Sequence, residues 1–222
     1  GCMSQIKLKH SGGNGVIIAA PSSNPASDRT LLLPSDGDGT ILTTNSAVGS
    51  WIKLSTTTIS SNVSDVTFTN SITGAFDTYN VYALVFERLQ ATNDAVELRM
   101  RIQEGGSTDT GNNYRFRVLS PDGNQTQQNA DKIRLNADPL GNDTSGSAVL
   151  AYASGIVYMR GFMANRIWNY DGRMAFLNDS ADKNFDVYGG GVNGTNATTG
   201  VLIYPESGSF ASGSVTLYGV GQ

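Results

Sequence analysis

The sequence is very poor in cysteine and histidine, each of which occurs once among 222 residues. Cys2 alone cannot form a disulfide within the chain or supply a zinc site built on several cysteines. His10 alone excludes a metal site with two or three histidine ligands, and its N-terminal neighbours give it no catalytic context. The lack of a disulfide fits a reducing compartment or a particle assembled inside a cell.

Lysine and glutamate are also scarce, with five and four copies, and only 15% of the residues are charged. Both residue types favour helices, whereas Ser, Thr, Asn and Gly disfavour them, and these four make up 88 of the 222 residues. A helical bundle is therefore excluded. Collagen is excluded too, because glycine shows no period of three and there are only six prolines.

Long apolar runs and excess positive charge are both missing. No stretch of about 18 apolar residues is present, so we expect no insertion into a membrane. The net charge is −4 and the isoelectric point is near 4.9, whereas proteins that bind nucleic acids concentrate lysine and arginine. We therefore expect no nucleic-acid partner.

The pattern that is present is typical of β-strands. Apolar and polar residues alternate along residues 96–103 and 114–118, which predicts strands with one buried and one charged face. Residues 79–89 are apolar on both faces, as expected of a central strand. Further strands are expected at residues 132–136, 155–164, 173–177, 185–188, 200–204 and 214–220. We predict an all-β fold, an antiparallel β-sandwich of jelly-roll type, with a long polar loop and a short helical turn within residues 120–150.

The first fifty residues differ from the rest. They hold the only proline cluster, Pro21, Pro25 and Pro34, and short apolar runs at residues 16–18, 31–33 and 41–42. These runs predict three short extended segments, too small to form a core alone, which pack on a larger body or on copies of themselves. We therefore expect an attachment and oligomerisation segment at residues 1–50 and a β-sandwich domain at residues 51–222.

Two short motifs favour ordinary structure over chemistry, and two glutamates are candidates for a catalytic pair. The run from Asp36 to Gly39 lacks the acidic residue of a calcium loop at its twelfth position, which is Ala47, so we interpret it as a turn. The triplet at residues 189–191 lacks the spacing of a phosphate loop and is interpreted as a flexible connection. A glycosidase needs two carboxyl groups flanking the bond, for which Glu87 and Glu206 are candidates.

Several phrases of the chain together resemble a known group of proteins. Residues 3–13, 20–26, 31–34 and 39–45 resemble the N-terminal segments of tail-fibre and other virion proteins of tailed bacteriophages, notably marine cyanophages. Residues 66–69, 76–79, 97–101 and 211–220 are similar to a sandwich module of phage fibres. The group shares no catalytic motif that could be carried over.

The resemblance implies a non-enzymatic virion component without a metal or other cofactor. It would be a homotrimer, either a tail fibre or a capsid decoration, assembled in the host cytoplasm. Its partners would be other virion proteins and a polysaccharide of the host surface. A carbohydrate-binding, lectin-like module is the alternative, and a glycan hydrolase is a third hypothesis.

Two pairs of arginines, Arg99 with Arg101 and Arg115 with Arg117, form the most unusual charge feature. Arginine is preferred where carboxylates are bound bidentately. One interpretation is a solvated sheet face with cross-strand partners such as Glu97. The favoured interpretation is an ion-pair network between subunits, because the resemblance implies a trimer. Binding of an acidic glycan or of lipopolysaccharide phosphate is a third.

The richest cluster for contact with a sugar lies between residues 166 and 173. Aromatic faces stack on pyranose rings while polar neighbours bind the hydroxyl groups. Trp168 and Tyr170 would share one face of a strand, and the alternative is that both are core aromatics of the sandwich. The candidate receptor-binding residues are Arg166, Trp168, Tyr170, Asp171 and Arg173.

Overall fold

A computed structural model describes residues 5–9, 11–13, 15–19, 51–70, 78–121, 123–142, 151–161, 167–194 and 196–221. The chain forms two compact units, residues 1–46 and residues 47–222. In the first unit, β1 (Gln5–Lys9) and β2 (Gly15–Ala19) pair as an antiparallel hairpin. The apolar run at 16–18 lies in β2, whereas the segments expected at 31–33 and 41–42 lie outside the described residues. The roles assigned to residues 1–50 and 51–222 stay predictions.

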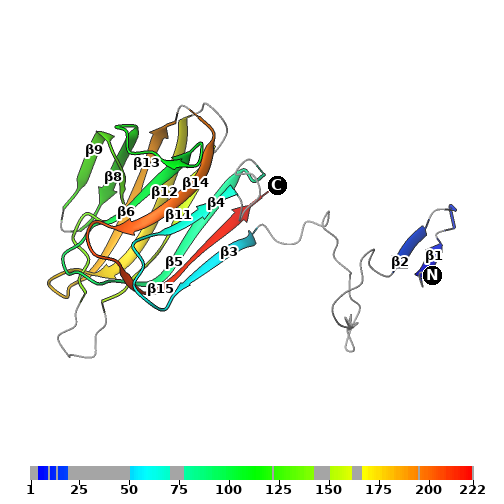
Figure 1. Cartoon of the computed structure of the whole chain (residues 1–222), viewed down its shortest axis with the longest axis horizontal. Coiled ribbons are helices and arrows are strands. Elements are labelled where there is room, and N and C mark those ends of the chain that lie inside the picture. The colour runs from blue at the N-terminus through cyan, green and yellow to red at the C-terminus, as the bar shows by residue number, and fades with distance from the viewer. Residues whose placement is uncertain are drawn as a thin grey trace. The chain divides into compact units, whose positions relative to one another are not determined.

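The second unit consists of two antiparallel sheets packed face to face, which confirms the predicted all-β sandwich (Figure 1). The larger sheet has eight strands, in the order β3 (Trp51–Ile59), β15 (Phe210–Val220), β5 (Val81–Ala91), β11 (Ala153–Arg160), β12 (Ile167–Leu177), β13 (Lys183–Asn193), β8 (Tyr114–Leu119) and β9 (Gln125–Ala130). The smaller sheet has the order β10 (Ile133–Arg134), β6 (Leu98–Glu104), β14 (Thr198–Pro205) and β4 (Val66–Thr69), with β7 (Ser107–Thr108) paired to β6.

Strand pairing in the second unit is nested. Strand β3 pairs with β15, β4 with β14, β5 with β11, and β6 with β10. Strand β15 also pairs with β5, and β14 also pairs with β6. Strands that lie far apart in the sequence are therefore neighbours, and the first and last strands of the unit lie side by side in the larger sheet.

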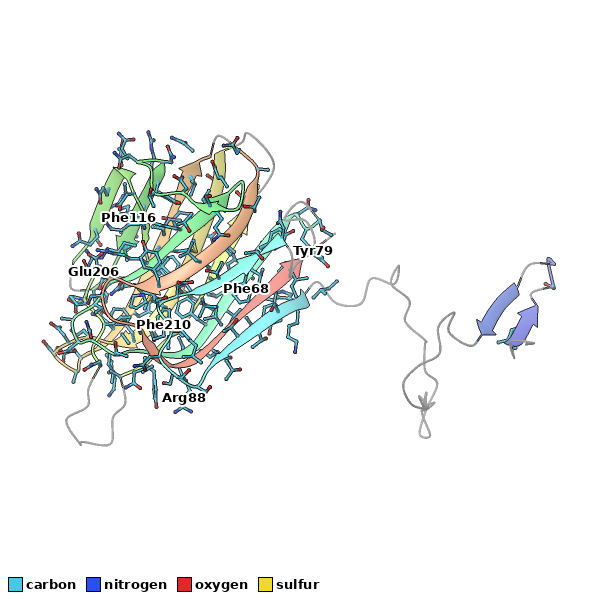
Figure 2. All side chains as sticks on the ribbon, in the orientation of Figure 1. Phe68, Tyr79, Arg88, Phe116, Glu206 and Phe210 are labelled. Carbon is cyan, nitrogen blue, oxygen red and sulfur yellow. The ribbon has the colours of Figure 1, made fainter. Side chains whose placement is uncertain are left out.

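The core lies between the two sheets and follows from strand periodicity. Along β6, Leu98, Met100 and Ile102 are fully buried, while the alternate residues are half-buried. Strand β8 shows the same alternation with exposed arginines. Phe68 of β4 and Phe210 of β15 lie between the sheets, where Figure 2 shows them. The alternation expected at residues 96–103 and 114–118 is thus confirmed, because side chains of a strand point alternately to its two faces.

Two tyrosines of the core lie over glycines of the adjacent strand. Tyr170 of β12 is the register partner of Gly190 in β13, and Tyr188 of β13 is the partner of Gly172 in β12. A Cβ atom at Gly190 would overlap the carbonyl oxygen of Arg115 and lie 2.7 Å from the Tyr170 hydroxyl. The glycines at 189–191 are therefore not a flexible connection, as the sequence had suggested, but the part of β13 that makes room for an aromatic ring.

The region expected to be a long loop, residues 120–150, contains strands in its described part. Polar β9 and short β10 lie there, and residues 123–142 include no helical turn. The prediction missed β9 because its residues are polar on both faces, so no periodicity marks it. Side-chain amides secure the segment that follows: Asn136 is fully buried and accepts a hydrogen bond from the Leu98 N–H at 2.7 Å.

A buried carboxylate secures the same segment. Asp186 of β13 is fully buried and accepts a hydrogen bond from the Ala137 N–H at 2.6 Å. Burial raises the pKa of Asp186, and the adjacent carboxylate of Asp138 raises it further. The Asp138 carboxylate itself accepts hydrogen bonds from the side chains of Asn178 and Asn184. Residues 136–138, which follow β10, are therefore attached to both sheets by polar contacts.

Candidate functional site

The outer face of the larger sheet carries a row of apolar side chains, of which those on β13 and β8 are exposed and those on β5 and β11 are half-buried. The strand register aligns Val85 of β5, Ile156 of β11, Val187 of β13 and Leu119 of β8, with Arg173 of β12 between Ile156 and Val187. Val187 is 44% exposed and Leu119 is 43% exposed. In the next row Phe185 is 48% exposed. Neighbouring exposed apolar side chains of this kind mark interaction surfaces.

Arginines flank this row on the same face. Arg115 and Arg117 of β8 are exposed, and their register partners are Gly191 and Gly189 of β13, which have no side chains. Among the described residues no carboxylate lies within ion-pair distance of either arginine. We call this surface the basic apolar face and define it by Arg115, Arg117, Leu119, Ile156, Arg173, Phe185 and Val187.

Aromatic side chains extend the outer face toward β3. Trp51 is 43% exposed, and its ring packs edge-on against Tyr218 of β15 and Tyr158 of β11, with centroids 5.5 and 5.9 Å away. Arg160 lies over the Tyr158 ring and forms an exposed ion pair with Asp171 of β12. The outer face of the larger sheet is therefore rich in aromatic, apolar and arginine side chains over most of its width.

The structure divides the predicted sugar-contacting cluster. Tyr170 is 2% exposed, and its hydroxyl donates a hydrogen bond to the Arg115 carbonyl oxygen at 3.0 Å. Burial raises the pKa of Tyr170. Tyr170 is thus a core residue, which is the alternative that the sequence left open, and it does not reach a ligand on the surface. Asp171 and Arg173 lie on the opposite face of the sheet, because successive residues of a strand point to opposite faces.

The other members of that cluster do not gather at one place among the described residues. Asp171 and Arg173 lie on the outer face, exposed, and Asp171 pairs with Arg160. The backbone of Trp168 lies in β12 opposite Val192 of β13. Arg166 lies outside the described residues. Their roles in glycan binding stay predictions.

Arg99 and Arg101 are neutralised within the chain, on the outer face of the smaller sheet. Arg99 Nη2 lies 2.7 Å from Glu97 and 2.5 Å from Glu206, and Arg134 lies 2.8 Å from Glu97. Arg101 lies 2.7 Å from Asp131. Glu97 is thus a partner of Arg99, as one interpretation expected, whereas the partner of Arg101 is Asp131. Arg115 and Arg117 lie on the other sheet. The four arginines therefore do not form one network, and an intersubunit role stays a prediction.

The carboxylates proposed for a hydrolase lie apart. Glu206 belongs to the ion-pair network beside the smaller sheet, whereas Glu87 follows Phe86 in the middle of β5 in the larger sheet. In the part of the chain that the structure describes, no three His, Cys, Asp or Glu side chains gather as a metal site. That part also contains no helix long and apolar enough to cross a membrane.

Sequence reasoning missed the exposure of Phe185 and Val187. Their alternation with Asp186 predicts buried apolar residues and an exposed carboxylate, but the structure has the opposite arrangement. Asp186 shares the inner face with Tyr188, which packs in the core, and its carboxylate binds the backbone at Ala137. Tyr188 is the sequence signal that could have indicated this arrangement. It shares a strand face with Asp186, and an aromatic residue marks a buried face as well as Phe185 and Val187 do.

No family model, no curated protein and no solved structure matches the chain significantly.

Proposed function

We propose that the chain is a non-enzymatic structural protein of a bacteriophage virion, a tail fibre or a capsid decoration, that acts as a homotrimer and binds a glycan of the host surface. The sequence resemblance supports this proposal. The nested pairing of β3 with β15, β4 with β14, β5 with β11 and β6 with β10 supports a jelly-roll core, extended by β12, β13, β8 and β9. Jelly rolls are common in viral capsid proteins and lectins.

The basic apolar face carries the trimer proposal, with a second copy of this chain as its occupant. Three apolar side chains on it are more than 40% exposed, and their burial against a copy would remove that area from water. The arginines beside them face outward, while the chain as a whole has a net charge of −4, so a copy offers carboxylates to them. In a closed ring of three, each copy would present this face to a different surface of the next copy.

In this proposal the two units have different roles. The segment before residue 51 docks on another virion protein, and the sandwich trimerises and presents its loops to the host polysaccharide. The proposal includes a location in the virion after assembly in the host cytoplasm.

Light scattering on a sizing column tests the trimer. The expected species has three times the mass of the 23.5-kDa chain. Val187→Asp introduces a charge in the middle of the apolar row and is expected to yield monomers, because a buried unpaired charge is costly. Ser61→Asp, in an exposed loop between β3 and β4, is the matched control and should stay trimeric. A monomeric unmodified protein, or a trimeric Val187→Asp variant, would contradict the assigned interface.

The alternative is a lectin-like module, which is favoured by a cleft lined with hydroxyl and charged groups, described below. A lectin needs no oligomer for its activity. A monomer that binds saccharides would therefore favour the lectin over the virion component.

A further inference from the structure

A cleft of about 460 Å³ opens on the larger sheet, where β3, β15 and β5 lie side by side. Its volume falls in the range of small-ligand sites, about 300–1,000 Å³. No local sequence pattern marks the cleft, because its lining comes from three strands and one loop. The lining residues are Thr58, Ile59, Glu87, Arg88, Tyr152, Ser212, Gly213 and Ser214.

The cleft lies beside a bulge in β5. Glu87 pairs with Ser214 and Gln90 with Ser212, so two residues of β5 stand opposite Gly213 alone. A bulge of this kind interrupts the alternation of side chains. As a result, Glu87 and Arg88 are both exposed although they are adjacent in the strand. The strand does not end at this charged pair but continues to Ala91.

The backbone of the bulge is strained. Arg88 has a φ angle of +53°, in the left-handed region that residues with side chains rarely adopt. Its N–H donates a hydrogen bond to Ser154 Oγ at 2.9 Å, which satisfies the donor that the bulge removes from the ladder. A Cβ at Gly213 would lie 2.7 Å from the Arg88 carbonyl oxygen, so only glycine permits the close approach of β15. Strain of this kind persists at sites where function needs the geometry.

The side chain of Arg88 is oriented by an aromatic ring. Its guanidinium carbon lies 4.6 Å from the centroid of the Tyr152 ring, and Nη2 donates a hydrogen bond to the Tyr152 hydroxyl at 3.1 Å. No carboxylate among the described residues forms an ion pair with this guanidinium. Its remaining N–H groups are therefore directed to solvent or to a ligand, beside the exposed carboxylate of Glu87.

We propose that this cleft binds one unit of a saccharide. Glu87 would accept hydrogen bonds from vicinal hydroxyl groups, Arg88 would donate to ring or hydroxyl oxygens, and the hydroxyls of Thr58, Ser212 and Ser214 can do both. Ile59 is the only aliphatic side chain among the lining residues, so most of the side-chain groups offered to a ligand are hydroxyl or charged groups. The inference rests on the glycan-binding part of the proposed function and assigns it to a place other than residues 166–173.

The test uses the full chain and a printed array of neutral and uronic-acid-containing oligosaccharides. Saccharides retained by the unmodified protein are then titrated against Arg88→Gly. This variant removes the guanidinium and replaces a strained residue by one that tolerates positive φ. Binding is expected to weaken at least tenfold, while the melting temperature rises.

Two controls separate the contributions of charge and backbone. Ala181→Gly relieves a positive φ of 62° outside the cleft, and Lys53→Ala removes a positive charge from β3. Both should bind as the unmodified protein does. Glu87→Gln keeps the shape of the carboxylate but loses its charge, and it should weaken binding without a change in melting temperature, since Glu87 is exposed.

The outcomes of the binding experiment do not depend on those of the light-scattering experiment. No retained saccharide, or retention by Arg88→Gly at full affinity, overturns the cleft whatever the mass in solution. Tenfold weaker binding by Arg88→Gly, with both controls unchanged, supports the cleft even for a monomer. Affinity that falls with added salt and prefers uronic acids identifies a sugar carboxylate as the partner of Arg88, whereas salt-independent binding of neutral sugars identifies hydroxyl groups.

Discussion

Asp186 shows how one residue can contradict its own sequence pattern. Its carboxylate is fully buried beside the backbone of Ala137, while its apolar neighbours Phe185 and Val187 are exposed. A buried carboxylate costs free energy unless it is hydrogen-bonded or protonated. Here the Ala137 N–H binds it, and burial favours its protonated form. Asp186 thus fixes the position of Ala137, but its buried carboxylate lowers the stability of the folded state at neutral pH.

The raised pKa of Asp186 predicts a pH dependence of stability. The folded state holds this proton more tightly than the unfolded state, whose pKa is near 3.8. The resulting stabilisation is complete below that value and is lost as the pH rises through the folded-state pKa. In Asp186→Asn, the amide oxygen still accepts from Ala137 but no proton is exchanged.

Urea unfolding of both proteins at several pH values from 4 to 8 measures this effect. The free energy of unfolding of the unmodified protein is expected to fall, relative to Asp186→Asn, as the pH rises. The comparison with the variant removes the opposite contribution of Asp131, whose pKa is lowered chiefly by its hydrogen bond from Lys132. A difference that is constant or grows with pH would contradict the assignment.

At the scale of elements, a cluster of ion pairs beside the smaller sheet is more buried than an ion pair on the larger sheet. Glu97 bridges Arg99 and Arg134 beside the smaller sheet, and the three side chains are 15–19% exposed. Asp171 and Arg160 on the larger sheet are 56% and 46% exposed. Solvent screens the second pair far more strongly than the first.

Glu97→Gln should therefore destabilise the sandwich by about 2 kcal/mol, since it weakens charged hydrogen bonds of two partly buried arginines. Asp171→Asn is the matched substitution at the exposed pair and should cost less than about 1 kcal/mol. Urea unfolding at neutral pH measures both free energies. Equal losses would show that burial does not govern the strength of these pairs.

Strands could be predicted from the sequence where apolar and polar residues alternate along the chain. The alternation in β6 and β8 identified both strands, because a strand with one buried face must repeat every two residues. Strand β9 lacks any such repeat, and the bulge at Arg88 depends on register with β15 and β11. Neither feature has a local signal, so neither could be found before the strands were paired.

For the whole molecule, the position of the core predicts the result of truncation. Every residue of the buried apolar cluster lies between Ile59 and Leu217, within the second unit. A chain of residues 51–222 should therefore keep the melting temperature of the full protein within a few degrees. Because the basic apolar face also lies in this part, the truncated chain should keep the proposed trimer while losing the proposed attachment to another virion protein.

Thermal unfolding measures the melting temperature of the truncated chain, and light scattering measures its oligomeric state. Loss of folding would show that residues 1–50 contribute to the core. A folded monomer would instead place the contacts between subunits in those first fifty residues.

The sequence alone determined the class of the fold and several absences. Few helix-forming residues and repeated alternation required an all-β protein, and single copies of cysteine and histidine excluded sites that need several. These inferences depend on composition or on neighbours along the chain. Tertiary structure decided which face of each strand is buried, which arginines are neutralised and where the cleft opens. Those features depend on pairing between distant strands: a bulge or an exchange of faces changes the surroundings of a residue without changing its local sequence.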